Sequence, residues 1–284
     1  MRLLVTGAGG MLGQDVVRVA RAAGDEVVAL GRAELDVTDA DAVARAVAAA
    51  RPDALVNCAA WTDVDGAESD PDGARVVNAT AAGQLARATA AAGARLVHVS
   101  TDYVFDGDRP RGAAPYVESD ATGPRSVYGA TKLAGEQAIA AAGGSHAIAR
   151  SSWLFGVGGR NFAATMLALA AERDELKVVH DQIGFPTATA HLAPALLELA
   201  RGDAQGVFHL AAAGAPASWC DFATEIFRQA GVATRVTPCT TAEMPRPAPR
   251  PAFSALASER PEAPVLPPWQ EGLADYLNRR KVHA

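Results

Sequence analysis

The sequence is constrained most strongly by a glycine-rich turn that begins at residue 7. Gly7, Gly10 and Gly13 follow a short apolar run at residues 2–6 and precede an Ala-rich segment with helical periodicity. Glycines at these positions permit a tight turn, a close approach of the backbone to a pyrophosphate, and close packing of the next helix on a sheet. The N–H groups at the start of such a helix bind phosphate. The turn therefore predicts a dinucleotide site.

The first 150 residues alternate short apolar runs with Ala-rich stretches. Such alternation is typical of an α/β fold whose parallel sheet is covered by helices on both faces. We therefore predict a Rossmann-type doubly wound sheet, which binds its ligands at the carboxyl ends of the strands. The expected strands are residues 2–6, 26–30, 54–57, 95–100 and 146–150, and the expected helices are residues 11–23, 39–50, 71–92 and 126–142.

The pattern is looser after residue 150. Eight prolines lie between residues 245 and 268 and predict extended loops, because proline removes a backbone donor and disfavours helix in the residue before it. We expect residues 1–150 to form the dinucleotide-binding core, and residues 151–284 to form mainly a small substrate-binding lobe with some segments returning to the core. The elements expected in this half are helices near 161–173, 189–201, 218–230 and 270–279, and strands at 176–180 and 206–210.

The overall charge and the cysteines exclude several functional classes. The net charge is -6 and no basic stripe is present, so nucleic acid is not an expected partner. The three cysteines are widely spaced and form neither a metal pattern nor a disulfide framework. No stretch approaches the roughly 20 apolar residues of a membrane span, and the N-terminal apolar run is too short for a signal peptide. We expect a cytoplasmic protein.

The second expected strand decides which dinucleotide is preferred. A carboxylate just after it would hold the adenosine ribose 2′-hydroxyl and favour NAD. Here the strand is followed by Gly31-Arg32, and Arg32 could pair with the 2′-phosphate of NADPH, while Glu34 opposes that preference. We expect NADPH to be preferred and NADH to be used as well; a surface charge in solvent is the alternative for Arg32.

A tyrosine and a lysine lie four residues apart at the start of the helix expected at 126–142. Tyr128 and Lys132 share one face of that helix and can meet one ligand. Reduction of a ketone leaves an alkoxide that needs a proton, and a phenol with a pKa near 10 becomes a better donor when an ammonium stabilises its phenolate. The chain has three lysines, so chance rarely places one of them four residues after a tyrosine. The pair predicts carbonyl chemistry.

A hydroxyl group should polarise the same ketone. Ser100-Thr101-Asp102-Tyr103 lies at the carboxyl end of the fourth expected strand. We choose Thr101, whose hydroxyl can donate to the carbonyl oxygen and then to the alkoxide. A turn cap is the structural alternative for this side chain.

Together these residues resemble the extended short-chain dehydrogenase/reductase superfamily and, within it, the dTDP-4-dehydrorhamnose reductase family. The resemblance covers nearly the whole chain, although the family often has another aromatic residue or a histidine at the Trp61 position. The matching segments are the glycine turn, Asp36-Val37, Asn57-Cys58-Ala59-Ala60-Trp61-Thr62-Asp63-Val64-Asp65, Ala67-Glu68, Val77-Asn78, Ser100-Thr101-Asp102-Tyr103-Val104-Phe105-Asp106-Gly107, Pro115-Tyr116 with Glu118, Asp120 and Pro124, Tyr128-Gly129 with Lys132, then Arg150, Trp153, Gly156, Asn161-Phe162, Asp181-Gln182, Gly184, Pro186-Thr187, and Arg250-Pro251 with Ser254 and Leu256.

The resemblance implies a reaction and a role for each matching residue. The reaction is NAD(P)H-dependent reduction of the 4-keto group of a dTDP-deoxysugar, first of all dTDP-4-dehydro-L-rhamnose to dTDP-L-rhamnose. Thr101, Tyr128 and Lys132 would be catalytic. The cofactor pyrophosphate would be held by Gly10, Met11 and Leu12, its adenine by Asp36 and Val37, and its nicotinamide by Ala59, Ala60, Trp61 and Thr62. The sugar nucleotide would contact Asp102, Tyr103 and Trp153, and its diphosphate would pair with Arg250.

Two other functions in this superfamily stay open on the sequence. An epimerase or 4,6-dehydratase would recycle its dinucleotide, but the dehydratases place an Asp-Glu pair after the threonine, whereas Tyr103 follows Asp102 here. A non-catalytic binding subunit, such as the regulatory subunit of methionine adenosyltransferase, is disfavoured by the intact Thr101, Tyr128 and Lys132.

Metal binding and assembly are suggested only by the resemblance. Some family members carry Mg²⁺ at a dimer interface through glutamates, and a homodimer is compatible with the resemblance. We match no metal ligands here: Asp15 could stand at the position of one of these family glutamates, but we interpret it as a charge in the first turn of a helix. His98 and His209 lie in expected strands and are interpreted as packed side chains.

Overall fold

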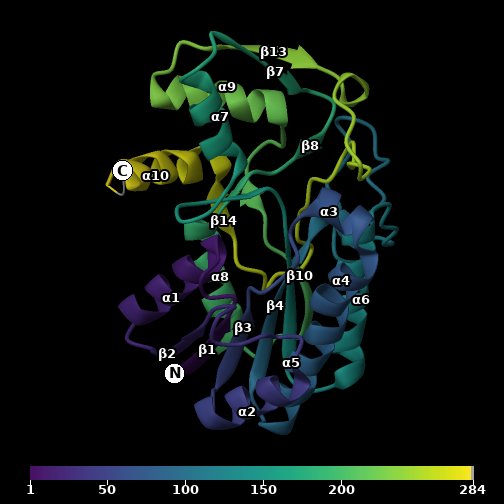
Figure 1. Ribbon diagram of the computed structural model, residues 1–284, viewed down its shortest axis with the longest axis vertical. Helices are drawn as coiled ribbons and strands as arrows, with labels where there is room; N and C mark the ends of the chain where they lie inside the picture. Colours follow the sequence, from purple (N-terminus) through teal and green to yellow (C-terminus); the bar gives the residue numbers. More distant parts are fainter. Residues whose placement is uncertain (283–284) are drawn as a thin grey trace.

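Six parallel strands form the central sheet of the computed structural model, which describes residues 1–282 (Figure 1). Their order is β10-β5-β4-β3-β1-β2, so the chain leaves β1 toward one edge and returns to the other side of β1 through β3. In such a sheet a ligand crevice opens at the carboxyl ends of the strands that flank the reversal. The strands are β1 (Arg2–Thr6), β2 (Glu26–Leu30), β3 (Ala54–Asn57), β4 (Arg95–Thr101), β5 (His146–Ser151) and β10 (Gly206–His209).

Alternate residues of each strand supply the two cores beneath the helices. Leu3 and Val5 of β1 are buried in a cluster with α1 (Met11–Ala22) and α8 (Thr189–Arg201). Leu4, between them, faces the opposite cluster, under α2 (Ala40–Ala50), α5 (Ala81–Ala91) and α6 (Val127–Ala142). Successive side chains of β1 therefore point to opposite faces of the sheet, and both faces are apolar.

One expected helix differs from the structure. We predicted a single helix over residues 71–92, whereas the chain forms α3 (Val64–Ser69), α4 (Pro71–Arg75), a π-helical turn η1 (Val76–Thr80) and then α5. Asp63 and Asp70 cap α3 and α4 through their carboxylates. A π turn inserts one residue into the helical repeat and commonly marks a functional position. Here it turns the side chain of Asn78 toward the loop after β3.

The second half of the chain forms a lobe above the sheet (Figure 1). Its core joins α7 (Phe162–Ala170), α9 (Trp219–Ala230) and α10 (Trp269–Val282) around aromatic side chains such as Phe155 and Phe222. The expected strand at 176–180 is β7 (Glu175–Val179), which pairs in parallel with an unexpected strand β13 (Arg235–Cys239). The remaining elements are β6 (Leu154–Phe155), β8 (Ile183–Gly184), β9 (Thr187–Ala188), β11 (Ala212–Ala213), β12 (Ala217–Ser218), β14 (Leu266–Pro268) and two short helical turns, η2 (Asp102–Val104) and η3 (Thr241–Glu243).

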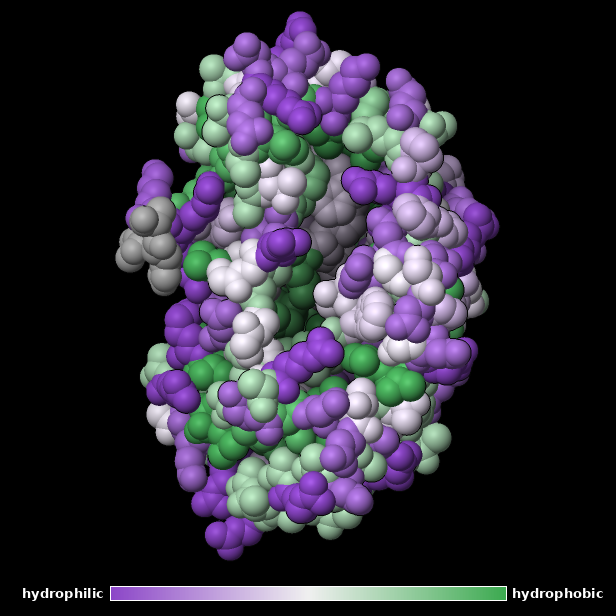
Figure 2. Space-filling view, in the orientation of Figure 1, coloured by the Kyte–Doolittle hydropathy of each residue, from purple (hydrophilic) through white to green (hydrophobic). Residues whose placement is uncertain are grey.

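Two segments of this half pack against the central sheet. Strand β10 adds to the edge of the sheet beside β5, and α8 lies against α1. Figure 2 shows the face of the molecule hollowed between the sheet and the lobe. Within residues 1–282, no helix combines the length and the apolar character that a bilayer crossing requires.

Candidate active site

The glycine turn after β1 leaves the start of α1 open. A Cβ on Gly7 would lie 2.5 Å from the backbone nitrogen of Ala59, and a Cβ on Gly13 would overlap the carbonyl oxygen of Gly7. Gly7 also has φ of 66°, a left-handed conformation that favours glycine. Gly10 precedes α1 without capping it through a side chain, so no side chain occupies the N–H groups of the first turn, which includes Met11 and Leu12. This geometry fits a bound pyrophosphate.

The residues after β2 form the adenosine end of the predicted cofactor site. Arg32 is exposed, and the Glu34 carboxylate accepts a hydrogen bond from the Gly31 nitrogen at 2.9 Å. Asp36 accepts from both the backbone nitrogen and the hydroxyl of Thr38, and these bonds hold the pKa of its carboxyl below the usual range. Val37 packs against the core under α2. Arg32 therefore keeps its guanidinium at the surface, where a phosphate could reach it.

The loop after β3 is fixed from two sides. Asn57 accepts a hydrogen bond from the Ala59 nitrogen at 3.0 Å. Asn78, from the π turn, accepts from the Trp61 nitrogen at 2.9 Å and donates to the Trp61 carbonyl. The segment from Ala59 and Ala60 to Trp61 and Thr62 is partly accessible, as a cofactor-lining loop should be. Asn57 and Asn78 stood in the matching segments without an expected role, and the structure shows that they hold this loop.

The three predicted catalytic residues lie where β4 ends and α6 begins: Thr101 is the last residue of β4, and Tyr128 and Lys132 lie in the first two turns of α6. Ser126 caps α6 by accepting from the Gly129 nitrogen. A Cβ on Gly129 would overlap the carbonyl oxygen of Tyr103, so only glycine lets α6 approach the turn after β4 this closely. The rings of Tyr103 and Tyr128 consequently lie 5.5 Å apart, edge to face. The Thr101 hydroxyl donates to Asp102 at 3.0 Å and accepts from the Tyr103 nitrogen.

The pKa of Tyr128 beside Lys132 differs from our expectation. We expected Lys132 to lower the pKa of Tyr128, but burial raises the pKa of Tyr128 to about 12, with only hydrogen bonding to Thr101 acting in the lowering direction. The Lys132 nitrogen donates instead to the carbonyl oxygen of Val99 at 2.7 Å and lies 3.2 Å from His98. Burial lowers the pKa of Lys132 to about 8. Desolvation therefore dominates both groups.

Asp102 is a buried carboxyl beside these hydroxyl groups. Burial raises its pKa to about 6, although the nearby side chain of Ser254 and the bond from Thr101 act in the opposite direction. Its Oδ2 has no hydrogen-bond partner among the described residues. An unpaired buried acceptor is costly, so a ligand hydroxyl at this position would be favourable.

Two predicted substrate residues already have partners in the protein. Trp153 has φ of 48°, unusual for a side chain with a Cβ, and its ring stacks on Trp219 with centroids 3.6 Å apart. Arg250 forms an ion pair with Asp65 at 2.9 Å, so its charge is already balanced. Both belong to the second half of the chain, as does Trp219, which no motif had indicated. A substrate diphosphate would have to share or displace Asp65 to pair with Arg250.

Asp15 is a buried junction, which corrects its interpretation as a first-turn helix charge. It lies one turn into α1 and is 2% exposed. Its Oδ1 accepts from Arg18 at 3.0 Å and Arg279 at 2.5 Å, and its Oδ2 accepts from Thr189 at 2.6 Å. Burial acts to raise the pKa of Asp15, but these bonds, from Arg279 first, outweigh it and lower the pKa. The carboxylate therefore joins α1, α8 and α10.

This junction does not fit Mg²⁺. Both carboxylate oxygens already accept from donors, two of them cationic, and residues 1–282 contain no group of three His, Cys, Asp or Glu side chains placed to hold a metal. We expect Mg²⁺ and EDTA to leave the thermal unfolding midpoint unchanged, because only a ligand that binds the folded state raises it. A midpoint that rises with Mg²⁺ in the native protein, but not in Asp15→Asn, would contradict this assignment.

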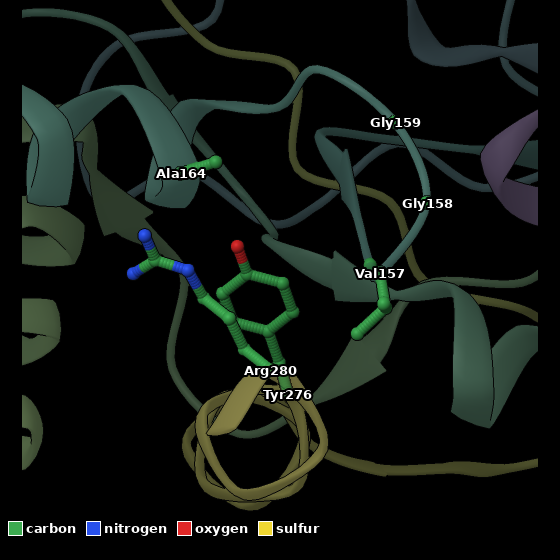
Figure 3. Close-up of a pocket in the computed structure, with 7 residues that line it drawn as sticks. Val157, Gly158, Gly159, Ala164, Tyr276 and Arg280 are labelled. Carbon is green, nitrogen blue, oxygen red and sulfur yellow. The ribbon is translucent and has the colours of Figure 1, made fainter. Parts of the chain in front are cut away.

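One cavity lies away from the predicted catalytic residues. It encloses about 240 Å³ between the loop at residues 156–159 and α10. Figure 3 shows the Tyr276 hydroxyl and the Arg280 side chain facing this space. Neither Thr101 nor Tyr128 lines it, so this cavity is separate from the predicted catalytic residues.

Comparison with known proteins places the chain in a family. A protein of Mycolicibacterium smegmatis named dTDP-4-dehydrorhamnose reductase is 46% identical over 96% of this chain and 84% of its own length. The family described as RmlD substrate binding domain matches residues 1–282. The chain belongs to the dTDP-4-dehydrorhamnose reductase family. The expectation from the motifs is thereby confirmed.

Two further family relatives extend the comparison. The crystal structure of dTDP-4-dehydrorhamnose reductase from Bacillus anthracis, in complex with NADP, is 37% identical with a TM-score of 0.93, covering 98% of this chain and 99% of that one. A Streptomyces antibioticus protein, named probable dTDP-4,6-dihydroxy-2-methyloxan-3-one 4-ketoreductase, is 43% identical over 97% of this chain and 94% of its own. The family therefore includes relatives named for different ketosugars.

Proposed function

We propose that the protein is an NADPH-dependent reductase of the 4-keto group of dTDP-4-dehydro-L-rhamnose, forming dTDP-L-rhamnose. The observation that carries the proposal is that Thr101, at the carboxyl end of β4, hydrogen-bonds Tyr128, with Lys132 one turn further along α6, in a chain that matches the family over residues 1–282. The same trio disfavours a non-catalytic binding subunit. Tyr103, which follows Asp102, disfavours elimination.

In this proposal the chain supplies the proton and holds the sugar. When bound, NADPH supplies the hydride for the ketone carbon. With substrate bound, the Thr101 hydroxyl turns its proton from Asp102 to the ketone oxygen and so stabilises the charge that develops there. Tyr128 then donates its phenolic proton to that oxygen, which completes the alcohol. The buried Asp102 accepts a sugar hydroxyl, and Trp153, which stacks on Trp219, contacts the sugar nucleotide with the part of its ring that stays accessible.

We also propose that the two halves of the chain divide the ligands. Residues 1–150 bind the dinucleotide, and residues 151–284 contribute mainly to the sugar nucleotide through Trp153 and Arg250. The described part of the lobe lies above the sheet, and the face of the molecule is hollowed between the two (Figures 1 and 2), which supports one crevice for both ligands. Arg250 lies close enough to affect the electrostatics of Tyr103, which supports its placement at this crevice.

We expect Arg32→Ala to weaken NADPH binding by about tenfold and to change NADH binding little, because a guanidinium forms charge-assisted hydrogen bonds with a 2′-phosphate. Dissociation constants from quenching of tryptophan fluorescence would measure both. Glu34→Gln is the matched variant, since it removes the opposing charge beside Gly31 and should strengthen NADPH binding. An equal loss for both dinucleotides in Arg32→Ala would show that Arg32 does not select the phosphate.

The decisive assay combines cofactor oxidation with product analysis. The protein should oxidise NADPH in the presence of dTDP-4-dehydro-L-rhamnose, and NMR of the product should show a hydroxyl at C4 with the configuration of L-rhamnose. Absence of NADPH oxidation with this substrate would reject the proposal. An as-purified absorbance spectrum with bound, recycled dinucleotide would favour an epimerase or dehydratase instead.

A second candidate is the reduction of a different dTDP-linked 4-ketosugar. It is favoured by the 43% identity to the probable ketoreductase of Streptomyces antibioticus. The same residues would act, since only the substituents of the hexose differ. Comparing kcat/KM for the two ketosugars in parallel would rank the candidates.

A further inference from the structure

A chain of buried polar side chains lies behind Lys132. The Lys132 Nζ lies 3.2 Å from His98 Nε2, and His98 Nδ1 lies 2.9 Å from the side-chain nitrogen of Asn57. All three residues are at most 3% exposed. Histidine in a strand is usually a packed side chain, and we had interpreted His98 in that way. Its contacts with Lys132 and Asn57 also determine which nitrogen of the His98 ring carries the proton.

The orientation of the Asn57 amide is fixed by a backbone donor. Its Oδ1 accepts from the Ala59 nitrogen at 3.0 Å and from the Thr6 hydroxyl at 2.7 Å. A backbone N–H can only donate, so the oxygen must face Ala59 and the NH₂ group must face His98. His98 Nδ1 is therefore an acceptor without a proton. The neutral ring then carries its proton on Nε2.

Protonating this ring would be unfavourable. An imidazolium would place an N–H on Nδ1 against the NH₂ of Asn57, donor against donor. Burial also holds the pKa of His98 well below its usual range, and the charge of Lys132 acts in the same direction. Nε2 therefore presents an N–H to Lys132.

The contact with Lys132 depends on the charge of the lysine. A neutral amine has a lone pair that accepts the hydrogen bond from His98 Nε2, while one of its own N–H groups donates to Val99. An ammonium has no lone pair, so its N–H groups would oppose the N–H of His98. We propose that Asn57, acting through the fixed tautomer of His98, favours the neutral amine of Lys132 over its ammonium.

The other groups around Lys132 do not reverse this preference. Glu136, on the same helix, acts to raise the pKa of Lys132, but it is paired with Arg150. Burial raises the pKa of the Cys58 thiol to about 12, so it carries no charge near neutral pH. Burial of Lys132 itself lowers its pKa to about 8, in agreement with the contact geometry.

Asn57 and His98 are thus positioning residues for the lysine. A lysine whose proton can leave and return near neutral pH is suited to restoring the proton that Tyr128 gives up, because proton transfer is most efficient when the pKa lies near the working pH. This catalytic use rests on the proposed function. The protonation preference itself does not, and it can be measured in the protein without substrate.

The test uses the low lysine content of the chain. Lysine labelled with ¹³C at Cε gives three signals, from Lys132, Lys177 and Lys281, and only Lys132 is buried. Lys132→Met identifies its signal by deletion. In the native protein we expect Lys132 to titrate near pH 8, and ¹⁵N NMR of the imidazole rings to show His98 neutral with its proton on Nε2. A proton on Nδ1, or an imidazolium at neutral pH, overturns the proposal.

Asn57→Leu removes the locking NH₂ group without adding charge. The proton of His98 can then move to Nδ1, leaving Nε2 to accept from the ammonium, and the pKa of Lys132 should rise by about 1, a tenfold change in the equilibrium. Thr6→Val is the matched control: it removes the other bond to the Asn57 oxygen but keeps the NH₂ group, so Lys132 should titrate as in the native protein. An unchanged Lys132 pKa in Asn57→Leu, or an equal rise in Thr6→Val, overturns the proposal. If Asn57→Leu does not fold, the ¹⁵N NMR measurement of the His98 tautomer in the native protein tests the proposal by itself.

Discussion

Replacing Tyr128 by phenylalanine should lower kcat by about 10²- to 10⁴-fold, because the variant loses the group that protonates the developing alkoxide. The phenylalanine ring keeps the edge-to-face contact with Tyr103, so the site should keep its shape. The dissociation constant for NADPH should therefore stay close to the native value. Steady-state kinetics and a fluorescence titration with NADPH measure the two effects separately.

Tyr276→Phe provides the control for this substitution. Tyr276 is buried and loses the same hydroxyl, but it lies on α10 beside the cavity of Figure 3, away from Thr101 and Tyr128. It should retain native kcat. Native turnover in Tyr128→Phe would remove Tyr128 from the mechanism, and a comparable loss in both variants would show that the effect comes from the fold.

The second large effect is expected on stability. Glu136 of α6 and Arg150 of β5 form a buried ion pair at 2.7 Å, with both side chains 5% exposed, and Ser100 donates to the same carboxylate at 2.5 Å. Glu136→Leu leaves the Arg150 guanidinium buried without its carboxylate, which should cost about 3–5 kcal/mol of unfolding free energy. Urea unfolding monitored by circular dichroism would measure the loss.

The double variant Glu136→Leu with Arg150→Met tests the cause. Replacing a buried pair by apolar side chains of similar volume is often neutral, whereas breaking it is not. The double variant should therefore recover most of the stability that Glu136→Leu loses. If the two variants are equally unstable, the loss comes from packing and not from an unpaired charge.

The fold was largely predictable because its signals are local. Strands such as Arg2–Thr6 are apolar runs bounded by turns, and the glycine turn sits between a strand and a helix that the pattern identifies independently. The strand β13 was missed because it contains Pro238 and because its pairing partner, β7, is remote in sequence: each paired residue lies 60 residues earlier in the chain. The π turn was missed because it is set by the contacts of Asn78 with Trp61 and Thr131.

The candidate site, like the fold, was predictable where its signals are local and was missed where they are not. Tyr128 and Lys132 are four residues apart, so their shared helix face follows from periodicity. The partners that determine their protonation come from other elements, and spacing contains no information on burial. For this reason our expectation that Lys132 lowers the pKa of Tyr128 was wrong, and we interpreted His98 only as a packed side chain.

The return of α8 and β10 to the sheet means that the two halves of the chain are not independent folding units. Leu192 and Leu196 of α8 cover Leu3 and Val5, and β10 completes the edge beside β5. A fragment ending near residue 150 would leave this apolar face and that edge open to solvent, an arrangement prone to aggregation. Exchanging the lobe between relatives would therefore require junctions on either side of these two segments, rather than one cut between the halves.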